Sequence, residues 1–524
     1  MSARAPWFLE ATEAAPSDLI SCQEAHTSSA LPLVCKRFHR LWNTSQLRWA
    51  TLNLDPAALQ RRLETLPAEE QDAALAALLR VLCMRAQATT RLWLHSNSPQ
   101  LLPLAQLLEL VSPHLQQVFI GQVACRSTLP LLQRFSHLRA LDIPACAYEH
   151  IEWEAEAHLL TDFIGLQELT LRDGGLSNAL LGVVAQLRGL KLLSVATAEP
   201  LPSRFHLEVG KLVSLEELDL YFVPAFAHRL FEVLPVAFRG LTRLRTLYIL
   251  APNPLKEHVF IGPGLADLPA LQDLQIRCQL EQVPSDLWMC GQLTKLDLEP
   301  RQQQGGSMGV VSPPSGIHMP ALQDLRMARC RFPGATLPLP FCDLAGLTRL
   351  AVMHCGLGGD ATAPGLPLQF TCLSRLASLS LEGNGLTSVP PGLVAVSTLR
   401  VLDLSCNSLT SLPPGPYLST LELLSISWNC FVRVPAMLCC AHACEVLDLS
   451  LNPQLELSRA DVEDTLLRMP RLGLLLLGKW PGCTAALNWR TDSVAALVCL
   501  AQQRPHLEVD FEHTAAEYDN LPLG

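Results

Sequence analysis

Charged residues are scarce in this chain of 524 residues, at 17%, and aromatic residues are scarcer still, at 6%. The 39 Lys and Arg are outnumbered by 49 Asp and Glu, which gives a net charge of −10. Without a basic excess, a nucleic-acid-binding protein is excluded. The low content of Glu and Lys argues against a coiled coil, and 49% hydrophobic residues exclude an intrinsically disordered chain.

Long uninterrupted apolar runs are also missing. No run reaches about 18 apolar residues without a charge or a proline, so we expect no membrane span despite a mean hydropathy of +0.24. Residues 1–30 lack a basic start followed by an apolar stretch, so no secretory signal is expected. The 18 cysteines are therefore predicted to be reduced thiols in a cytoplasmic or nuclear protein.

A short apolar pattern, Leu-x-x-Leu-x-Leu with Ile, Val or Met as substitutes, recurs along the chain. Its 15 copies start 22 to 29 residues apart, at Leu115, Leu138, Leu166, Leu190, Leu215, Leu244, Leu271, Leu293, Leu322, Leu347, Leu376, Leu399, Leu421, Cys444 and Leu472. In a short strand, alternate side chains point to opposite faces, so Leu402 and Leu404 are expected inside and Asp403 outside. No single repeat can bury its own apolar face, so the pattern predicts a solenoid that is stabilised by stacking.

The motif and its period resemble the leucine-rich repeat, most closely in "LASLSLEGNGLTSVP" and "LRVLDLSCNSLTSLP". The resemblance covers at least 115–477 and implies an α/β solenoid with a parallel sheet on its concave side. In this family an Asn after each strand binds backbone groups of the turn. That position holds Asn384, Asn407, Asn429 and Asn452, and in other repeats Cys146, Cys330 and Cys355. These cysteines are expected to be buried and unpaired, because a small thiol can fill the same interior slot.

Repeat length predicts what lies between the strands. Spacings of 22–23 residues from Leu376 onward predict extended segments, whereas longer spacings predict helices at 222–238 and 462–469. The Gly- and Pro-rich stretch 299–320 is predicted to be an inserted loop. A helix at 492–502 and a strand in "LEVDFE" would cap the last open edge of the array.

The segment "LPLVCKRFHRLWNTSQLRWATLNLD", 31–55, resembles the second half of an F-box, the helical module that binds the Skp adaptor of cullin ubiquitin ligases. Val34, Phe38 and Leu41 share one helical face, and Trp49 and Leu52 would close over it. An opening half is echoed only by Pro16, Leu19 and Ile20, since "CQEAHTSS" replaces the expected Ile- and Phe-rich turn. The resemblance assigns adaptor binding to Pro16, Leu19, Ile20, Val34, Cys35, Phe38, Leu41, Trp49 and Leu52.

These features divide the chain into successive parts. They are a disordered N-terminus (1–15), a partial F-box (16–55), a solenoid (56–481, with degenerate repeats at 56–114 and clear ones at 115–481), a cap (482–511) and a tail (512–524).

Motifs for chemistry are weak. Ser307 in "GGSMG" matches a nucleophile elbow but lies in the predicted loop, not on a sharp strand-to-helix turn. In "CCAHAC", Cys444 takes a buried repeat position, whereas Cys439 and Cys440 fall on the convex surface, so structural filling is favoured over a zinc site. No phosphate-binding loop or zinc-protease helix is present. We therefore expect no enzyme activity, cofactor or metal.

The outward strand positions carry the best binding signal. Acidic residues there outnumber basic ones, with Asp142, Glu168, Glu217, Asp219, Asp273, Asp297, Glu299, Asp324, Glu382, Asp403 and Asp448 against Arg172, Arg277, Lys295, Arg326 and Arg349. Tyr221 and Tyr248 are predicted on consecutive strands beside Asp219, and exposed Tyr often anchors interfaces. Asp219, Tyr221, Tyr248, Asp297 and Arg326 are therefore the candidate residues for binding a protein of basic or mixed charge. The alternative is that these side chains only solvate the strand faces.

The family resemblance implies a substrate-recognition subunit of a Skp–cullin–F-box ubiquitin ligase, in which the repeats hold a protein substrate. The alternative is an interaction scaffold without a ligase role, whose F-box has decayed. A hydrolase that uses Ser307 would need a triad that the sequence does not offer. No nucleic acid or membrane partner is expected.

Overall fold

The computed structural model describes residues 51–54, 91–96, 114–122, 125–143, 157–172, 176–222, 229–251, 257–280, 283–299, 311, 313–358, 365–478 and 491–511. The chain divides into two compact units. Unit 1 comprises 1–123 and 134–138, and unit 2 comprises 124–133 and 139–524.

Among its described residues, unit 1 has the strands β1 (Thr51–Leu54), β2 (Arg91–Ser96) and β3 (Gln117–Gln122). They pair in parallel in that order, and Leu52 of β1 is aligned with Leu92 of β2. Leu92 and Val118 are fully buried. Leu52 therefore lies in a strand, and β2 is a strand among the predicted degenerate repeats.

Unit 2 is built on one long parallel sheet. Its strands are β4 (Ala140–Ile143), β5 (Glu168–Arg172), β6 (Leu192–Thr197), β7 (Glu217–Phe222), β9 (Thr246–Leu250), β11 (Asp273–Arg277), β13 (Lys295–Leu298), β14 (Asp324–Ala328), β15 (Arg349–Met353), β16 (Ser378–Ser380), β17 (Val401–Asp403), β18 (Leu423–Ser425), β19 (Val446–Asp448), β20 (Leu474–Leu476) and β21 (Glu508–Asp510). Each pairs with the next. Every strand of this sheet from β4 to β20 begins two residues after the first position of its motif, which confirms the predicted solenoid.

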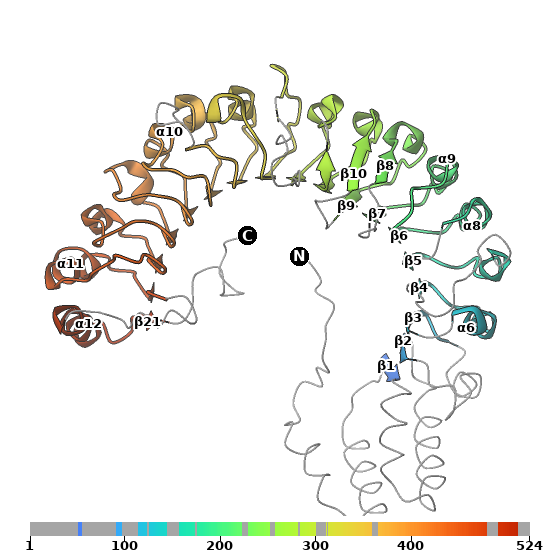
Figure 1. The fold of residues 1–524 in the computed structure, drawn as a ribbon, viewed down its shortest axis with the longest axis horizontal. Helices are drawn as coiled ribbons and strands as arrows, with labels where there is room; N and C mark the ends of the chain where they lie inside the picture. Colours follow the sequence, from blue (N-terminus) through green and yellow to red (C-terminus); the bar gives the residue numbers. More distant parts are fainter. Residues whose placement is uncertain are drawn as a thin grey trace, which may run out of the picture. The chain divides into compact units, whose positions relative to one another are not determined.

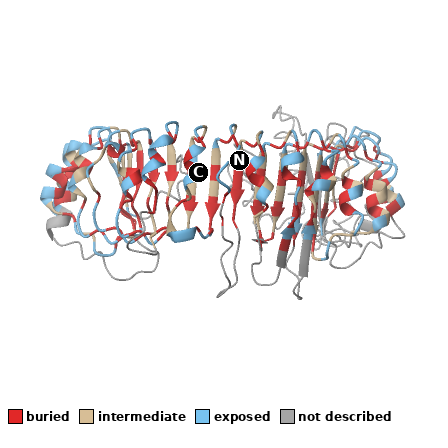
Figure 2. Cartoon of the chain, turned by 90° about the horizontal axis from the view of Figure 1, so that it is seen from above, coloured by how far each residue is buried: buried red, intermediate tan, exposed pale blue. Residues whose placement is uncertain are grey.

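The core lies directly behind this sheet. The predicted inward pairs are all buried: Leu169 and Leu171, Leu218 and Leu220, Leu379 and Leu381, Leu402 and Leu404, Leu447 and Leu449. Buried residues run along the strands, and exposed residues gather on the turns (Figure 2). Stacked rungs of Leu thus supply the apolar burial that one repeat cannot achieve alone.

Helical segments return the chain on the outer side of the curve in unit 2 (Figure 1). The α-helices are α6 (Cys125–Leu132), α8 (Asn178–Val184), α9 (Phe205–Val209), α10 (Pro391–Val394), α11 (Arg459–Asp464) and α12 (Thr491–Gln503). The 3-10 helices are η2 (Ala157–Leu160), η3 (Pro235–Phe238), η4 (Leu265–Asp267), η5 (Ser285–Met289), η6 (Pro333–Ala335), η7 (Leu339–Asp343), η8 (Leu368–Cys372), η9 (Pro416–Leu418), η10 (Ala436–Cys440) and η11 (Leu466–Arg468). None of the helices in these described segments is long and apolar enough to cross a membrane.

Several predicted connections are confirmed. Helices α11 and η11 occupy the predicted helical region at 462–469, and Ser458 caps α11 through a reciprocal pair of hydrogen bonds with Asp461. Helix α12 and strand β21 are the predicted terminal helix and strand. The predicted loop contains neither helix nor strand at 313–320, and residues 300–310, including Ser307, lie outside the described part.

The helix predicted at 222–238 is wrong. The structure instead has strand β8 (Arg229–Val233), which joins β10 (Glu257–Ile261) and β12 (Gln279–Leu280) in a second parallel sheet. In the described part of the predicted span, 222 and 229–238, only the last turn, η3, is helical. Pro235 explains part of this result, because proline breaks a helix interior and disfavours the helical conformation in the residue before it.

Candidate functional site

Strand register brings the candidate residues of the concave face together across five consecutive strands, β7, β9, β11, β13 and β14. Asp219 is aligned directly with Tyr248, and Tyr221 lies two residues further along β7 on the same face. Asp297 is aligned directly with Arg326. The predicted neighbourhood of Asp219 and the two tyrosines is therefore real, whereas Asp297 and Arg326 form a second group on later strands.

An acidic patch, which we define as Glu217, Asp219, Tyr221, Tyr248 and Asp273, covers β7, β9 and the start of β11. Burial raises the pKa of Glu217, and the charges of Asp273 and Glu168 raise it further. Burial raises the pKa of Asp219 to about 7, assisted by the negative charge of Glu217. Negative charge is therefore crowded here, and the two carboxylates resist ionising together.

The two tyrosines of the acidic patch differ in their surroundings. The Tyr248 hydroxyl lies 3.4 Å from Asp273 Oδ2, and burial together with nearby carboxylates raises the pKa of Tyr248. Tyr221 is 38% exposed. Tyr221 is therefore the side chain of the patch with the most obvious surface to offer a partner, because an aromatic ring contributes a large contact area.

Few groups among the described residues offset the negative charge of Glu217 and Asp219, at the centre of the acidic patch. Ser194, which is aligned with Asp219, donates a hydrogen bond to it, but Asp219 Oδ1 is buried without a hydrogen-bond partner among the described residues. No basic side chain of the described residues lies within ion-pair distance of Glu217 or Asp219. Only Asp273, at the edge of the patch, has a cation nearby, at 3.7 Å from Lys295 Nζ.

The second group behaves differently because its charges are matched. Arg277 lies 2.6 Å from Asp297 Oδ2 and 4.0 Å from Glu299, which Arg329 also contacts at 3.1 Å. Asp297 is only 2% exposed. Arg326 makes no ion pair with Asp297, and its Nε is buried without a hydrogen-bond partner among the described residues. Asp297 is therefore chiefly an internal ion-pair partner of Arg277.

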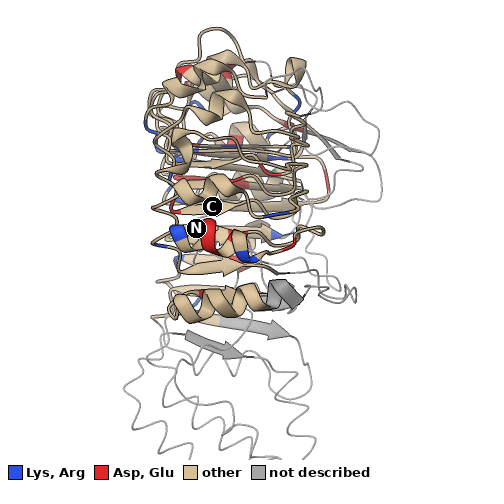
Figure 3. Cartoon of the chain, turned by 90° about the vertical axis from the view of Figure 1, so that its left-hand side faces the viewer, with Lys and Arg blue, Asp and Glu red and all other residues tan. Residues whose placement is uncertain are grey.

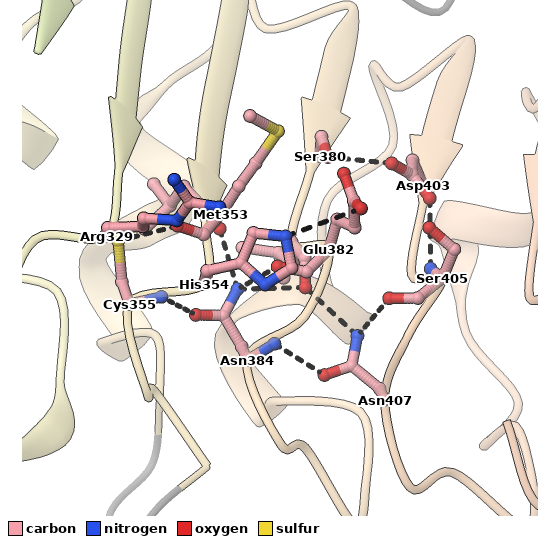
Figure 4. A network of polar contacts seen from close by, with 12 residues as sticks. Arg329, Met353, His354, Cys355, Ser380, Glu382, Asn384, Asp403, Ser405 and Asn407 are labelled. Atoms are coloured by element: carbon pink, nitrogen blue, oxygen red, sulfur yellow. Dashed lines mark hydrogen bonds and ion pairs between the residues drawn. The ribbon is translucent and has the colours of Figure 1, made fainter. Parts of the chain in front are cut away.

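Towards the C-terminal strands, the concave face carries short polar side chains. Ser380 donates to Asp403 at 2.8 Å (Figure 4), and Ser425 donates to Asp448 at 3.1 Å. Ser425 and Asp448 are buried, although their strand positions point away from the Leu core. On the side of unit 2 that Figure 3 turns to the viewer, acidic and basic residues are sparse and interspersed. The carboxylates of Asp403 and Asp448 thus accept hydrogen bonds from serine hydroxyls on the neighbouring strand.

A ladder of Asn side chains supports the turns that follow the strands. Asn407 accepts hydrogen bonds from the backbone amides of Asn384 and Leu386, both at 3.0 Å, and donates to three carbonyls (Figure 4). Cys330 and Cys355, in the same position, are buried, and their thiols donate to backbone carbonyls. The prediction that Cys replaces Asn is confirmed at both positions, while Cys146 lies outside the described residues.

The other predicted motifs are placed as follows. In "CCAHAC", Cys444 is fully buried and Cys440 is exposed, as expected for filling a repeat position. Across the described part of the chain, no three His, Cys, Asp or Glu side chains are gathered to hold a metal ion.

The F-box-like residues 16–49 lie outside the described residues. Of the residues assigned to adaptor binding, only Leu52 is placed, in β1. Adaptor binding therefore remains a prediction.

Comparisons with known proteins bear on the fold. Residues 374–416 match the family described as leucine rich repeat. The chain is similar in structure to a leucine-rich-repeat protein from Leptospira interrogans, with 21% identity, coverage of 83% of this chain and 98% of that chain, and a TM-score of 0.57. An internalin from Listeria monocytogenes matches with 12% identity, 84% and 94% coverage and a TM-score of 0.35. No curated protein sequence matches the chain. The fold is a leucine-rich-repeat solenoid.

Proposed function

We propose that this leucine-rich-repeat chain is a protein-interaction scaffold that binds its partner on the concave face of unit 2. The observation that carries the proposal is the acidic patch, where the half-buried carboxylates of Glu217 and Asp219 have no basic partner among the described residues and lie beside the exposed ring of Tyr221. Removing two neighbouring like charges from water costs free energy. A surface that only faced solvent would therefore have no reason to hold Asp219 and Glu217 partly buried side by side.

The chemistry of the acidic patch favours a partner segment that carries Lys or Arg beside an apolar or planar group. A cation placed against Glu217 and Asp219 would relieve their mutual repulsion. The ring of Tyr221 can stack against a guanidinium or an apolar side chain. The ion pairs of Arg277 and Arg329 with Asp297 and Glu299 would then form the rim of the interface, where contacts contribute less.

Site-directed photo-crosslinking in the native cellular extract tests this proposal. A photoreactive phenylalanine at Tyr221 should capture a discrete protein, and Glu217→Gln with Asp219→Asn should reduce that capture. The matched control is the same group at Leu207, which is 66% exposed on α9. Equal capture at both positions, or capture at Tyr221 that is insensitive to the two carboxylates, would contradict a binding role for the acidic patch.

A second candidate function is substrate recognition for a Skp–cullin–F-box ubiquitin ligase. It is supported by the F-box-like sequence 31–55, which runs into strand β1, since such a module precedes the repeats in the family. The test is co-purification of the full chain with the Skp adaptor, compared with a Phe38→Ala and Trp49→Ala variant. Retention of the adaptor by the native chain alone supports this function, and no retention by either contradicts it.

A further inference from the structure

Two consecutive thiols, Cys439 and Cys440, lie at the end of the 3-10 helix η10, in the segment that returns the chain before β19. Their Sγ atoms are 3.9 Å apart. Cys440 is exposed and Cys439 is partly exposed, in contrast to the fully buried Cys444 nearby. Within the described residues, Cys439 and Cys440 are thus two thiols that contact each other and are both accessible to solvent.

The buried cysteines of the repeats are chemically protected, whereas this pair is not. Burial raises the pKa of Cys278 and of Cys444, to about 12 for Cys444, so both stay protonated and unreactive. At Cys439 the pKa is raised by partial burial and by the hydrogen bond with Cys440. Cys439 therefore keeps its proton more readily than an ordinary thiol, and its sulfur lies within contact distance of Cys440 Sγ.

We propose that Cys439 and Cys440 form a reversible modification site for low-molecular-weight disulfides of the glutathione type, with Cys440 as the nucleophile and Cys439 as the resolving thiol. A solvent-accessible thiol with a resolving cysteine beside it is the arrangement that thiol redox sites share. The site is separate from the concave face, because η10 belongs to the returning segment and not to a strand.

The reaction balances without a further oxidant. The Cys440 thiolate attacks one sulfur of the small disulfide R–S–S–R, forms a mixed disulfide and releases R–S⁻. Cys439 then loses its proton and attacks Cys440 Sγ, which forms the Cys439–Cys440 bond and releases the second R–S⁻. In total the two protein thiols lose two protons and two electrons, and the small disulfide is reduced to two thiols.

The product should be easy to reduce. Disulfides usually join Cα atoms about 4.4–6.8 Å apart, whereas adjacent residues are held at about 3.8 Å. A bond between neighbours is therefore strained, and strained disulfides are the labile ones. The pair would consequently respond to the ratio of small disulfide to small thiol and would not lock permanently.

A metal role for the pair is less well supported. Structural zinc needs four ligands, and among the residues that the structure places no third His, Cys, Asp or Glu completes a set with these two sulfur atoms. Two neighbouring thiols do suffice for disulfide exchange, which needs one nucleophile and one resolving group.

The test is to incubate the reduced full chain with oxidised glutathione, quench it with acid and locate the products by peptide mass spectrometry. The native chain should accumulate the Cys439–Cys440 disulfide, detected as loss of two hydrogens, and added reduced glutathione should reverse it. Cys430 is an exposed single cysteine and serves as the internal control. It should stop at a mixed disulfide.

Two substitutions separate the roles of the pair. Cys439→Ser keeps a hydrogen-bond donor but cannot resolve, so the mixed disulfide should persist on Cys440. Cys439→Ala removes the hydrogen-bond donor as well and should give the same persistent mixed disulfide, because resolution needs the Cys439 sulfur. A mixed disulfide that persists on Cys440 in the native chain, as it should in Cys439→Ser, would overturn the proposal.

Discussion

Replacing Asn407 by Ala should destabilise the turns of the central repeats through two specific backbone amides. The three carbonyls that Asn407 contacts keep other donors: Leu381 O accepts from Asn384, Leu404 O accepts from Asn429, and Ser405 O accepts from the Gly383 amide. The amides of Asn384 and Leu386 have Asn407 Oδ1 as their acceptor. The loss therefore falls on the amides and not on the carbonyls.

The magnitude follows from that count. An orphaned buried amide costs about 1–3 kcal/mol, so Asn407→Ala should cost about 2–6 kcal/mol. Asn407→Cys should be nearly as damaging, although the chain uses Cys at this position elsewhere, because a thiol donates to carbonyls but accepts poorly. The control is Ser408→Ala at the next, exposed residue, which should stay within about 0.5 kcal/mol of the native protein.

Hydrogen exchange is the suitable assay, because long repeat arrays need not unfold in one step. The amides of Asn384 and Leu386 should lose protection by about 30-fold or more, which corresponds to at least about 2 kcal/mol. Unchanged protection at both amides in Asn407→Ala would refute the assignment of Oδ1 as their necessary acceptor. Equal losses in Ser408→Ala would refute the specificity of the effect.

Three further predictions concern burial. Leu404→Ala should cost about 2–5 kcal/mol in denaturant unfolding, because Leu404 is fully buried in the stacked core, and a near-neutral effect would count against that packing. Burial lowers the pKa of His206, so the contribution of His206 to stability is complete above about pH 6.5, the unfolded value, and declines as the pH falls below it. His206→Phe should therefore flatten the dependence of the unfolding free energy on pH below that value. An unchanged pH dependence in this variant would be contrary evidence. A maleimide should label the exposed Cys430 in seconds to minutes but leave Cys330 and Cys355 unlabelled in the native protein. Both are buried, and the hydrogen bond with Cys355 together with burial raises the pKa of Cys330. Rapid labelling of either buried cysteine would argue against its interior position.

The parallel sheet of unit 2 could be predicted from the sequence because period-two alternation and repeat spacing are local signals. The same signals located the interior cysteines Cys330 and Cys355, since each occupies the position of Asn407 in its own repeat. The second sheet was missed because β8 is only five residues long, and so short a segment does not reveal by periodicity whether it is strand or helix.

The candidate site was predictable only in part. Sequence positions placed Asp219 and Tyr248 on one face, and register then made them direct neighbours. The same rule placed Asp297 and Asp448 on the outward face, yet both are buried, because Arg277 and Ser425 respectively bond to them. Alternation specifies the side of a sheet, whereas burial on that side depends on which side chains the neighbouring strands place beside it.

The pH dependence of partner binding tests the central claim most directly. Once a partner has been captured at Tyr221, its affinity should be measured at pH 6 and pH 8, for the native chain and for Asp219→Asn. Because burial raises the pKa of Asp219 to about 7, a cationic partner should bind more tightly at pH 8, by up to about tenfold if it requires the ionised carboxylate. Asp219→Asn should abolish most of this difference. An affinity that is equal at both pH values in the native chain, or a pH effect that survives in Asp219→Asn, would contradict the acidic patch as the binding site.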